Sequence, residues 1–532
     1  MRLGIDFGTT RTVVAMADRG NYPVVTFESE IGDATEWFPS VVAERRGELR
    51  FGHDALAVAR DPEWTTLRSV KRYLSAGSGV VRVGSIELPA AELVSRFLDA
   101  LVTALRTRSN VARAIKKDAT LEAVVATPAN ALCTQRLLTL DAFRAAGFDV
   151  RAMLNEPSAA GFEYAHRHAR TLSSSREHVV VYDLGGGTFD ASLVRMTGTH
   201  HDVLTTSGVG QLGGDDFDRV LAELVLAKAA RPGQASLADL SPSEAARLLD
   251  ECRAAKEALA ATARKVTVDL DGVFDGGGAI SVATADFYDA ATPLVNRTLD
   301  ALLPVLQTEA AGASEGVVAS ADAGDLGLPS DVAGLYVVGG ASALPIIGRL
   351  LRARFGRRVH RSPYPHAAVA IGLAIAGDEE AGFELVDRLS RNFGVFREED
   401  GGARASYDAI LTRDLALPRA GEPPLVIERR YRAAHDLGHY RFFECSDFDE
   451  AGAPRGEIAP MTDVRFPFER ALQEALRKKT DVSLAERPVR RLGHEGPLVL
   501  ERYAVDASGT VEVTITDLES GYHTTSRLGA VG

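Results

Sequence analysis

Two short glycine-rich turns, each opened by an aspartate, are the residues of this sequence best suited to hold phosphate. The first turn runs from Asp6 to Thr10 (DFGTT), and the second runs from Asp183 to Asp190 (DLGGGTFD). In such turns the backbone N–H groups point inward at an anion, and glycine lets the chain approach it closely. The leading carboxylates are placed to meet hydrated Mg²⁺, which prefers a few carboxylates, water and nucleotide phosphates to a full protein cage. A structural hairpin accounts for either turn alone, whereas both together favour a nucleotide site.

The chain around each turn predicts the same local structure. Residues 3–18 predict a β-hairpin, because β-branched residues resume directly after the turn, and residues 179–196 repeat this design. The two leading residues, Asp6 and Asp183, align with a separation of 177 positions. Such an internal repeat predicts two related lobes that face each other across a cleft.

The segments between and after the turns alternate between helix and strand patterns, which predicts α/β architecture. Residues 90–105 carry apolar side chains at helical spacing, and residues 124–127 predict a short buried strand. Ser241 and Glu244 form a capping box around a proline, so a helix is expected to begin there.

After about Asp378 the pattern changes to short strands separated by turn residues, for example at 424–432, 440–445 and 511–516. This change predicts a separate β-rich domain. One candidate helix, Phe468 to Lys479, carries its apolar residues on one face and interrupts the strands as an insertion would.

Length, charge and cysteine content narrow the class of protein. A chain of 532 residues favours two to four compact units. The net charge of −13, from 60 basic and 73 acidic residues, argues against general binding to nucleic acid or an anionic membrane. The three cysteines are over a hundred residues apart and form no CxxC pair, which fits a reducing cytoplasm. No signal peptide precedes the first strand and no run of 18 apolar residues occurs, so no membrane segment is expected.

Other phosphate-binding motifs fail on specific grounds. A P-loop requires a lysine directly after a glycine, and no lysine in the chain follows one. Gly208 to Gly213 matches the dinucleotide pattern GxGxxG, but it lies deep in the chain and follows a phosphate turn that is already assigned. A dinucleotide site is therefore disfavoured.

Five motifs in this order and spacing resemble the nucleotide-binding domain of the DnaK-type seventy-kilodalton heat-shock chaperones. They are Gly4 to Thr10, Asn155 to Ala160, Tyr182 to Asp190, Leu212 to Asp218 and Val337 to Ser342. The resemblance runs from residue 1 to about 378, and Thr66 to Leu74 adds the catalytic-lysine segment of the family with Lys71 in place. It implies an actin-like, two-lobed ATPase domain built from duplicated ribonuclease-H-like halves, followed by a β-rich, sandwich-like C-terminal domain.

The resemblance also implies a role for each matching residue. Asp6 and Asp183 would hold Mg²⁺ through water. The residues expected to orient the attacking water are Lys71, Glu156, Asp190 and Thr188. Those expected to bind ATP or ADP are Gly8, Thr9, Thr10, Arg11, Gly185, Gly186, Gly187, Gly213, Gly214, Lys256, Gly339, Gly340 and Ala341. These roles are physically reasonable, because phosphoryl transfer needs positioning and charge neutralisation more than covalent chemistry. Without the surrounding segment, Lys71 would be interpreted as a solvated surface lysine.

The adenosine side departs from the family pattern. Where two arginines usually sandwich the base, this chain carries Glu257 and Ala343, and His366 replaces a usual acidic residue. Arg253 and Glu257 are spaced as an i, i+4 helix-surface ion pair, which contributes only a few tenths of a kcal/mol. Losing two stacking guanidiniums, each contributing roughly 1 kcal/mol, predicts weaker or less adenine-selective binding.

Three regions follow from the resemblance: an ATPase domain at 1–378, an interdomain linker at 379–390 and a polypeptide-binding domain at 391–532. Phe383 to Asp387 resembles the apolar linker of the family, although an ordinary edge strand would explain it too. The chain stops at Gly532, so the helical lid of typical members is expected to be absent, and a lidless cleft should release peptide quickly.

The leading hypothesis is an ATP-hydrolysing chaperone or chaperone-like switch in the bacterial cytoplasm that binds and releases unfolded client polypeptide. A J-domain co-chaperone and a nucleotide-exchange factor are possible partners, with no nucleic acid and no membrane. One alternative is a nucleotide-gated protein-interaction module with little or no hydrolysis. An actin-like filament protein or a small-molecule kinase of the same fold is disfavoured, because neither needs a β-rich appendage.

Overall fold

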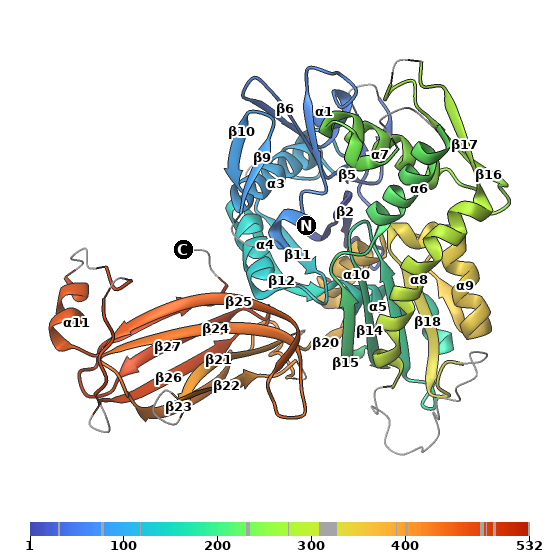
Figure 1. The fold of residues 1–532 in the computed structure, drawn as a ribbon. Helices are drawn as coiled ribbons and strands as arrows, with labels where there is room; N and C mark the ends of the chain where they lie inside the picture. Colours follow the sequence, from blue (N-terminus) through green and yellow to red (C-terminus); the bar gives the residue numbers. More distant parts are fainter. Residues whose placement is uncertain are drawn as a thin grey trace. The chain divides into compact units, whose positions relative to one another are not determined.

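The computed structural model of the chain describes residues 1–29, 32–75, 79–116, 119–229, 235–274, 276–307, 327–389, 391–399, 403–413, 415–478, 483–485, 487–492 and 496–529. These residues divide into two compact units, drawn as a ribbon in Figure 1. The first unit contains Met1–Asn130 and Ala142–Leu385, and the second contains Ala131–Asp141 and Val386–Gly532. The expected linker at 379–390 spans the end of the first unit and stays a prediction.

The first hairpin lies in a mixed sheet. In the described part of the chain this sheet has the order β12-β11-β1-β2-β5. Its strands are β1 (Arg2–Phe7), β2 (Arg11–Met16), β5 (Phe38–Pro39), β11 (Leu121–Thr127) and β12 (Phe148–Asn155). β1 pairs antiparallel with β2 on one side and parallel with β11 on the other, and β12 continues the parallel half. The predicted hairpin and the predicted strand at 124–127 are both confirmed.

The second hairpin lies in a sheet with the same topology. Its described strands follow the order β19-β18-β13-β14-β15-β20. They are β13 (His178–Leu184), β14 (Phe189–Thr197), β15 (His200–Val209), β18 (Val332–Val338), β19 (Val359–Arg361) and β20 (Glu384–Val386). β13 pairs antiparallel with β14 and parallel with β18, as β1 does with β2 and β11. The repeated order confirms the predicted pair of related lobes.

Two helices, α5 (Glu156–His168) and α10 (Ala368–Ala376), join the lobes. Their residues share buried clusters with strands of both sheets. The backbones of the two helices are in direct contact, because a Cβ added at Gly372 of α10 would overlap the carbonyl oxygen of Ala159 in α5. This packing fixes the cleft between the two hairpin turns.

The remaining helices of the first unit cover the outer faces of the lobes. α3 spans Ala90–Thr107, which confirms the helix predicted at 90–105. Ser241 caps α7 as predicted, with its hydroxyl accepting from the Glu244 N–H at 3.3 Å. The other helices are α1 (Gly52–Ala57), α2 (Arg72–Ser75), α4 (Cys133–Ala145), α6 (Gly214–Ala229), α7 (Pro242–Glu257), α8 (Thr284–Gln307) and α9 (Pro345–Phe355). The small strands are β3 (Phe27–Glu28), β4 (Ala34–Thr35), β6 (Val41–Arg45), β7 (Glu48–Phe51), β8 (Thr65–Arg68), β9 (Val80–Val83), β10 (Ile86–Pro89), β16 (Lys265–Asp269) and β17 (Ala279–Ala283).

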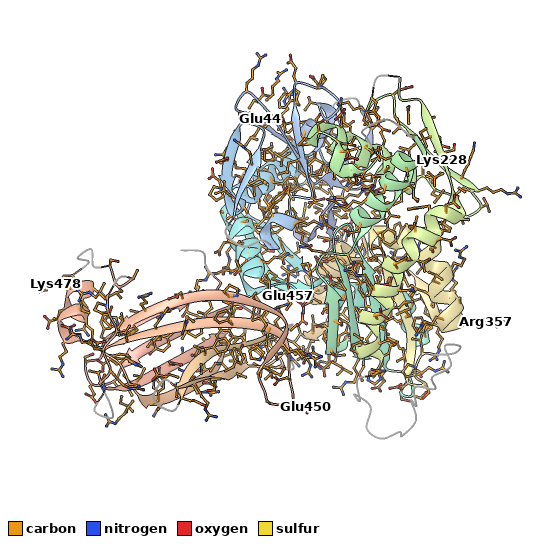
Figure 2. The ribbon with its side chains drawn as sticks, in the orientation of Figure 1. Glu44, Lys228, Arg357, Glu450, Glu457 and Lys478 are labelled. Atoms are coloured by element: carbon orange, nitrogen blue, oxygen red, sulfur yellow. The ribbon has the colours of Figure 1, made fainter. Side chains whose placement is uncertain are left out.

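The second unit is a sandwich of two antiparallel sheets. In its described residues the orders are β22-β21-β24-β25 and β23-β26-β27-β28. The strands are β21 (Asn392–Glu399), β22 (Arg404–Leu411), β23 (Leu425–Arg432), β24 (Leu437–Phe448), β25 (Pro454–Pro467), β26 (Leu498–Val505), β27 (Val511–Asp517) and β28 (His523–Arg527). Buried residues of both sheets, such as Phe442 and Tyr503, form one core, and side chains fill the space between the sheets (Figure 2). The predicted β-rich domain is confirmed.

The helix predicted at Phe468 to Lys479 is α11, which spans Arg470–Arg477; Lys479 lies outside the described residues. Gln473 of α11 donates to Asp517 Oδ2 over 2.9 Å, so the helix packs against the turn after β27. None of the helices in the described part of the chain combines the length and the apolar character that crossing a membrane would require.

Strand β20 lies at the edge of the six-stranded sheet and includes the core of the linker-like segment. The Glu384 N–H donates to the Thr199 carbonyl over 3.0 Å. Just before it, the Phe383 ring meets His201 and Phe162, with ring centroids 5.4 and 5.5 Å away. The segment therefore forms an edge strand here, and its role as a linker stays a prediction.

His201 is a buried and uncharged contact of this segment. Its ring stacks on Phe162 at 4.8 Å, and neither ring nitrogen has a hydrogen-bond partner among the described residues. Burial, helped by the neighbouring His200, lowers the pKa of His201 to about 4.

Replacing His201 with phenylalanine should make the first unit less sensitive to acid. In the unfolded chain the pKa of His201 returns to its ordinary value near 6.5. Its contribution to stability is therefore fully present above pH 6.5 and is lost as the pH falls toward 4, by about 3 kcal/mol at most. Thermal unfolding at pH 7.0 and 4.5 should show a smaller fall in Tm for His201→Phe than for the wild type. The exposed His523→Gln control should follow the wild type. Parallel falls in all three proteins would contradict this assignment.

Candidate functional site

A cavity of about 280 Å³ opens between the two hairpin turns in the first unit. Most of the residues predicted for the site line it: Asp6, Gly8, Thr9, Thr10, Arg11, Lys71, Glu156, Asp183, Gly185, Gly186, Thr188, Gly214, Lys256, Gly339, Gly340 and Ala341. Gly187, Gly213 and Asp190 adjoin this lining: a Cβ added at Gly213 would lie 2.5 Å from Gly187 N, and Thr188, which lines the cavity, is hydrogen-bonded to Asp190. Every predicted residue therefore lines the cavity or adjoins its lining, although they come from segments throughout the first unit.

The two turns are packed against each other. A Cβ added at Gly186 would lie 2.8 Å from Thr10, and one added at Gly187 would lie 2.7 Å from the Thr9 hydroxyl. Each turn is closed by a backbone bond, Gly8 N–H to Asp6 O and Gly185 N–H to Thr188 O, both 3.0 Å. Larger side chains would fill the space in which the turns meet, so this spacing requires glycine.

Lys71 is buried at the base of the cavity, with 4% of its surface exposed. Its Nζ donates to Glu156 Oε1 over 2.5 Å. The carboxylates of Asp6 and Asp190 also act on its charge. Although burial acts to lower it, these carboxylates hold the pKa of Lys71 above its ordinary value. The interpretation of Lys71 as a solvated surface lysine is therefore wrong.

Three buried aspartates face this lysine without enough positive charge to match them. Burial and the Glu156 carboxylate raise the pKa of Asp6 to about 7, and the same causes raise that of Asp190 to about 7. Burial and the neighbouring carboxylates raise the pKa of Asp183 well above its ordinary range. When ionised, these three groups and Glu156 carry four negative charges against the single charge of Lys71. The site thus attracts a further cation.

Thr188 and Asn130 hold the Asp190 carboxylate in place. The Thr188 hydroxyl is hydrogen-bonded to it, and the Asn130 backbone N–H donates to Oδ1 over 3.2 Å. Asp190 therefore keeps a fixed orientation next to the cavity wall.

Lys256 and Arg253 of α7 anchor the start of α6. Lys256 Nζ donates to the Gly214 carbonyl over 2.7 Å and lies 2.6 Å from Asp218 Oδ1. Arg253 pairs with Asp215 at 3.1 Å and with Asp218 at 3.3 Å. The predicted i, i+4 pair between Arg253 and Glu257 is wrong, because these aspartates of α6 lie closer to Arg253 than Glu257 does.

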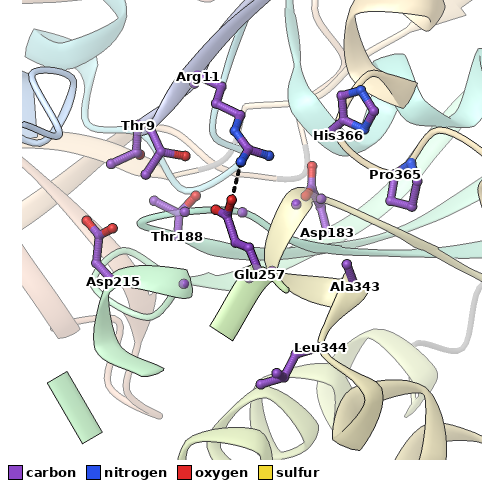
Figure 3. A pocket seen from close by; sticks show the side chains of 18 of the residues that line it. Thr9, Arg11, Asp183, Thr188, Asp215, Glu257, Ala343, Leu344, Pro365 and His366 are labelled. Carbon is purple, nitrogen blue, oxygen red and sulfur yellow. Dashed lines mark hydrogen bonds and ion pairs between the residues drawn. The ribbon is translucent and has the colours of Figure 1, made fainter. Parts of the chain in front are cut away.

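Glu257 pairs instead with Arg11, which comes from the opposite lobe (Figure 3). The Arg11 guanidinium also lies 4.4 Å from the centroid of the Trp37 ring. His366 Nε2–H donates a hydrogen bond to Glu36 Oε2 over 3.1 Å, and the His366 ring meets Trp37 edge-on. This end of the cavity is thus closed by a cross-lobe ion pair rather than by free guanidiniums.

Several lining residues were not expected from the sequence. Asp215 and Asp218 belong to a motif that was recognised, but no role was assigned to them. Leu259 and Leu344, together with Ala343, give the far end of the cavity an apolar surface. Leucine carries no chemical signal in a sequence, so only the fold could place these two in the site.

Comparison with known protein families identifies the family to which this architecture belongs. The family model described as Hsp70 protein matches residues 2–390. The chain belongs to the Hsp70 family. Its first unit is the actin-like ATPase fold of that family, and a β-rich region follows it.

Curated Hsp70-family relatives match beyond the ATPase region. The "Chaperone protein HscA homolog" of Burkholderia ambifaria is 32% identical over 442 residues, and that of Burkholderia multivorans is 32% identical over 443. The protein of the same name from Burkholderia mallei (strain SAVP1) is 33% identical over 443 residues. Each match covers 79% of this chain and 65% of the relative, so the chain spans less than two thirds of their length.

Proposed function

We propose that this chain is an ATP-hydrolysing chaperone or chaperone-like switch that couples its nucleotide state to binding and release of unfolded polypeptide. The observation that carries the proposal is the buried Lys71–Glu156 pair, which faces three aspartates at the meeting point of two glycine-rich turns. A surface lysine or a merely structural hairpin would not need this arrangement. The chaperone names of the relatives support the same function.

The residues divide the work of phosphoryl transfer between them. The turns at Gly8 to Thr10 and Gly185 to Gly187 present backbone N–H groups to the phosphates. Lys71 and Glu156 position the attacking water at the γ-phosphate, and Asp190 accepts its hydrogen bond while Thr188 orients that carboxylate. Such positioning supplies most of the catalysis in this class of reaction.

Magnesium fits the residues present. Asp6 and Asp183 would hold the ion, and their raised pKa values, caused by burial and neighbouring carboxylates, support a cation at this position. Among the described residues no group of three or more His, Cys, Asp or Glu side chains is arranged to ligate a metal by itself. Water and phosphate oxygens would complete the coordination, as Mg²⁺ prefers. When bound, the ion would neutralise phosphate charge.

The proposed binding of polypeptide, and its coupling to the nucleotide state, involve the second unit and the segment at 379–390. We assign client binding to the β-sandwich and coupling to β20, which lies at the edge of the six-stranded sheet and can therefore exchange its partner. A J-domain co-chaperone and an exchange factor are the proposed partners, and neither nucleic acid nor a membrane is required. Because the relatives are bacterial and all three cysteines are free, we place the protein in a bacterial cytoplasm.

The direct test is steady-state ATP turnover with and without a reduced and alkylated, permanently unfolded polypeptide. We expect the polypeptide to raise turnover several-fold, and chelation of Mg²⁺ to abolish it. Hydrolysis that is indifferent to polypeptide would refute the coupling, and absence of any hydrolysis would refute the ATPase.

Because the expected base-stacking arginines are absent, restoring one of them should increase the affinity for ATP. Ala343→Arg places a guanidinium beside the apolar end of the cavity and should strengthen ATP binding about fivefold, since cation–π stacking contributes roughly 1 kcal/mol. The wild type should prefer ATP to GTP by less than about tenfold. Isothermal titration with both nucleotides checks these values. Ala290→Arg, at an exposed position of α8, adds the same charge elsewhere and should change neither affinity. Tight and strict ATP selectivity in the wild type would contradict the prediction.

A further inference from the structure

A second cavity, of about 620 Å³, lies beside the nucleotide cavity in the first unit. One face of α9 lines it, together with parts of β18 and β19, Tyr288 of α8 and residues 259–261. Leu259, Ala343 and Leu344 line both cavities, and the latter two are labelled in Figure 3. The proposed ATPase reaction uses the first cavity only.

Three arginines line this second cavity without acidic partners. Arg349 and Arg352 lie one turn apart on α9, and Arg361 lies on β19. The lining contains no aspartate or glutamate, and no described carboxylate forms an ion pair with any of the three. The Arg349 guanidinium lies 5.1 Å from the centroid of the Tyr288 ring, which gives it a fixed neighbour.

The charge pattern around the cavity is unusual for this chain. Residues 332–377 contain six arginines and no acidic residue, although the whole chain has a net charge of −13. One of the six is structural, because Arg358 donates to the carbonyls of Pro329 and Val332 at 2.7 and 2.8 Å. Partial burial and the nearby Arg352 lower the pKa of Arg361, so these two guanidiniums repel each other. Such repulsion is relieved when an anion binds.

We propose that this cavity is a second anion-binding site, which takes a small ligand with at least two phosphate groups through Arg349, Arg352 and Arg361. Guanidiniums bind phosphate oxygens in pairs with defined geometry, and three of them match more negative charge than one phosphate carries. Gly348 lies on the same face of α9, and a Cβ added there would meet nothing within 4 Å. The glycine therefore leaves room for the ligand between the arginines.

The test measures binding of inorganic tripolyphosphate by isothermal titration at low ionic strength. The protein is first saturated with ADP and Mg²⁺, so that the nucleotide cavity is filled. We expect one tripolyphosphate per chain, and Arg352→Glu combined with Arg361→Glu should weaken it at least tenfold. The control is Arg357→Glu, an exposed arginine of the same segment that does not line the cavity (Figure 2). Its affinity should stay within twofold of the wild type.

A second variant tests the space rather than the charge. Gly348→Phe keeps all three arginines, fills the cavity and should also weaken tripolyphosphate at least tenfold. Citrate, with three carboxylates, should bind at least fivefold more weakly than tripolyphosphate; equal binding would overturn the assignment to phosphate. Unchanged affinity in the double-glutamate variant or in Gly348→Phe would overturn the site. If ADP itself does not bind, the same comparison without nucleotide still decides this proposal, because it does not depend on hydrolysis.

Discussion

Replacing Lys71 with alanine is expected to lower single-turnover ATP hydrolysis by at least about 100-fold while ATP still binds. The ammonium group lies 2.5 Å from Glu156 Oε1, and the carboxylates of Asp6 and Asp190 also act on its charge. Removing a preorganised charge of this kind typically costs a factor of about 10² to 10³ in rate. Binding should persist, because the two glycine-rich turns proposed to contact the phosphates remain intact. Rapid-quench measurement with enzyme in excess separates the chemical step from product release.

The Lys71→Ala result needs a control for the loss of a lysine as such. Lys265→Ala removes an exposed lysine of β16 and should keep the wild-type rate. Loss of Lys71 also leaves four carboxylates without a cation, so the pKa values of Asp6 and Asp190 should rise above about 7. The nucleotide-free variant should therefore keep losing stability above pH 7, where the loss in the wild type levels off. A normal single-turnover rate in Lys71→Ala would refute its catalytic assignment.

The residues proposed to bind phosphate could be identified from the sequence because they lie in short local motifs. A structural hairpin would explain either glycine-rich turn alone, but the two copies, at Asp6 and Asp183, together favour a nucleotide site. The fold then had only to bring them together, and the repeated sheet order does so. What the motifs did not show is how closely the turns meet, at Gly186 against Thr10 and Gly187 against Thr9.

The base half was less predictable because its contacts join segments far apart in the chain. The i, i+4 spacing predicted that Arg253 pairs with Glu257, because that rule considers only residues within the same helix, α7. In the fold, Arg253 forms ion pairs with Asp215 and Asp218 of α6, and Glu257 forms an ion pair with Arg11 of the other lobe. Which acidic residue pairs with which arginine depends here on tertiary packing between distant segments. Local spacing in the sequence does not predict such pairs.

In the C-terminal unit, too, local elements could be predicted from the sequence but long-range pairings could not. Period-two patterns located strands such as β23 and β27, because one face of each is buried in the sandwich. β23 pairs with β26, more than 60 residues later, although β24, β25 and α11 lie between them in the chain. The alternating pattern alone could not show that these two strands are neighbours.

Gly339→Ala is expected to weaken Mg²⁺-ATP binding at least tenfold and to lower stability by about 2 to 6 kcal/mol. Gly339 has φ of +85° and ψ of 144°, and a Cβ there would overlap Asp183 Oδ1 and the Leu184 carbonyl oxygen. Backbone strain in this region costs an L-residue about 1 to 3 kcal/mol, and overpacking adds about 1 to 3. Relief requires Asp183 to move away from the place where the metal would be held. The Gly339 N–H also donates to Pro365 O over 2.8 Å, so the opposite wall of the cavity would shift with it.

The matched control for this substitution is Gly147→Ala. Gly147 has the same φ of +85°, but a Cβ there would meet nothing within 4 Å. It therefore carries the strain of a positive φ without the collision and should lose only about 1 kcal/mol, with unchanged nucleotide affinity. Thermal unfolding and isothermal titration of the two variants side by side separate strain from displacement of Asp183. If Gly339→Ala binds Mg²⁺-ATP as tightly as Gly147→Ala does, the position of Asp183 does not determine metal and nucleotide affinity, and its assignment as a metal ligand is wrong.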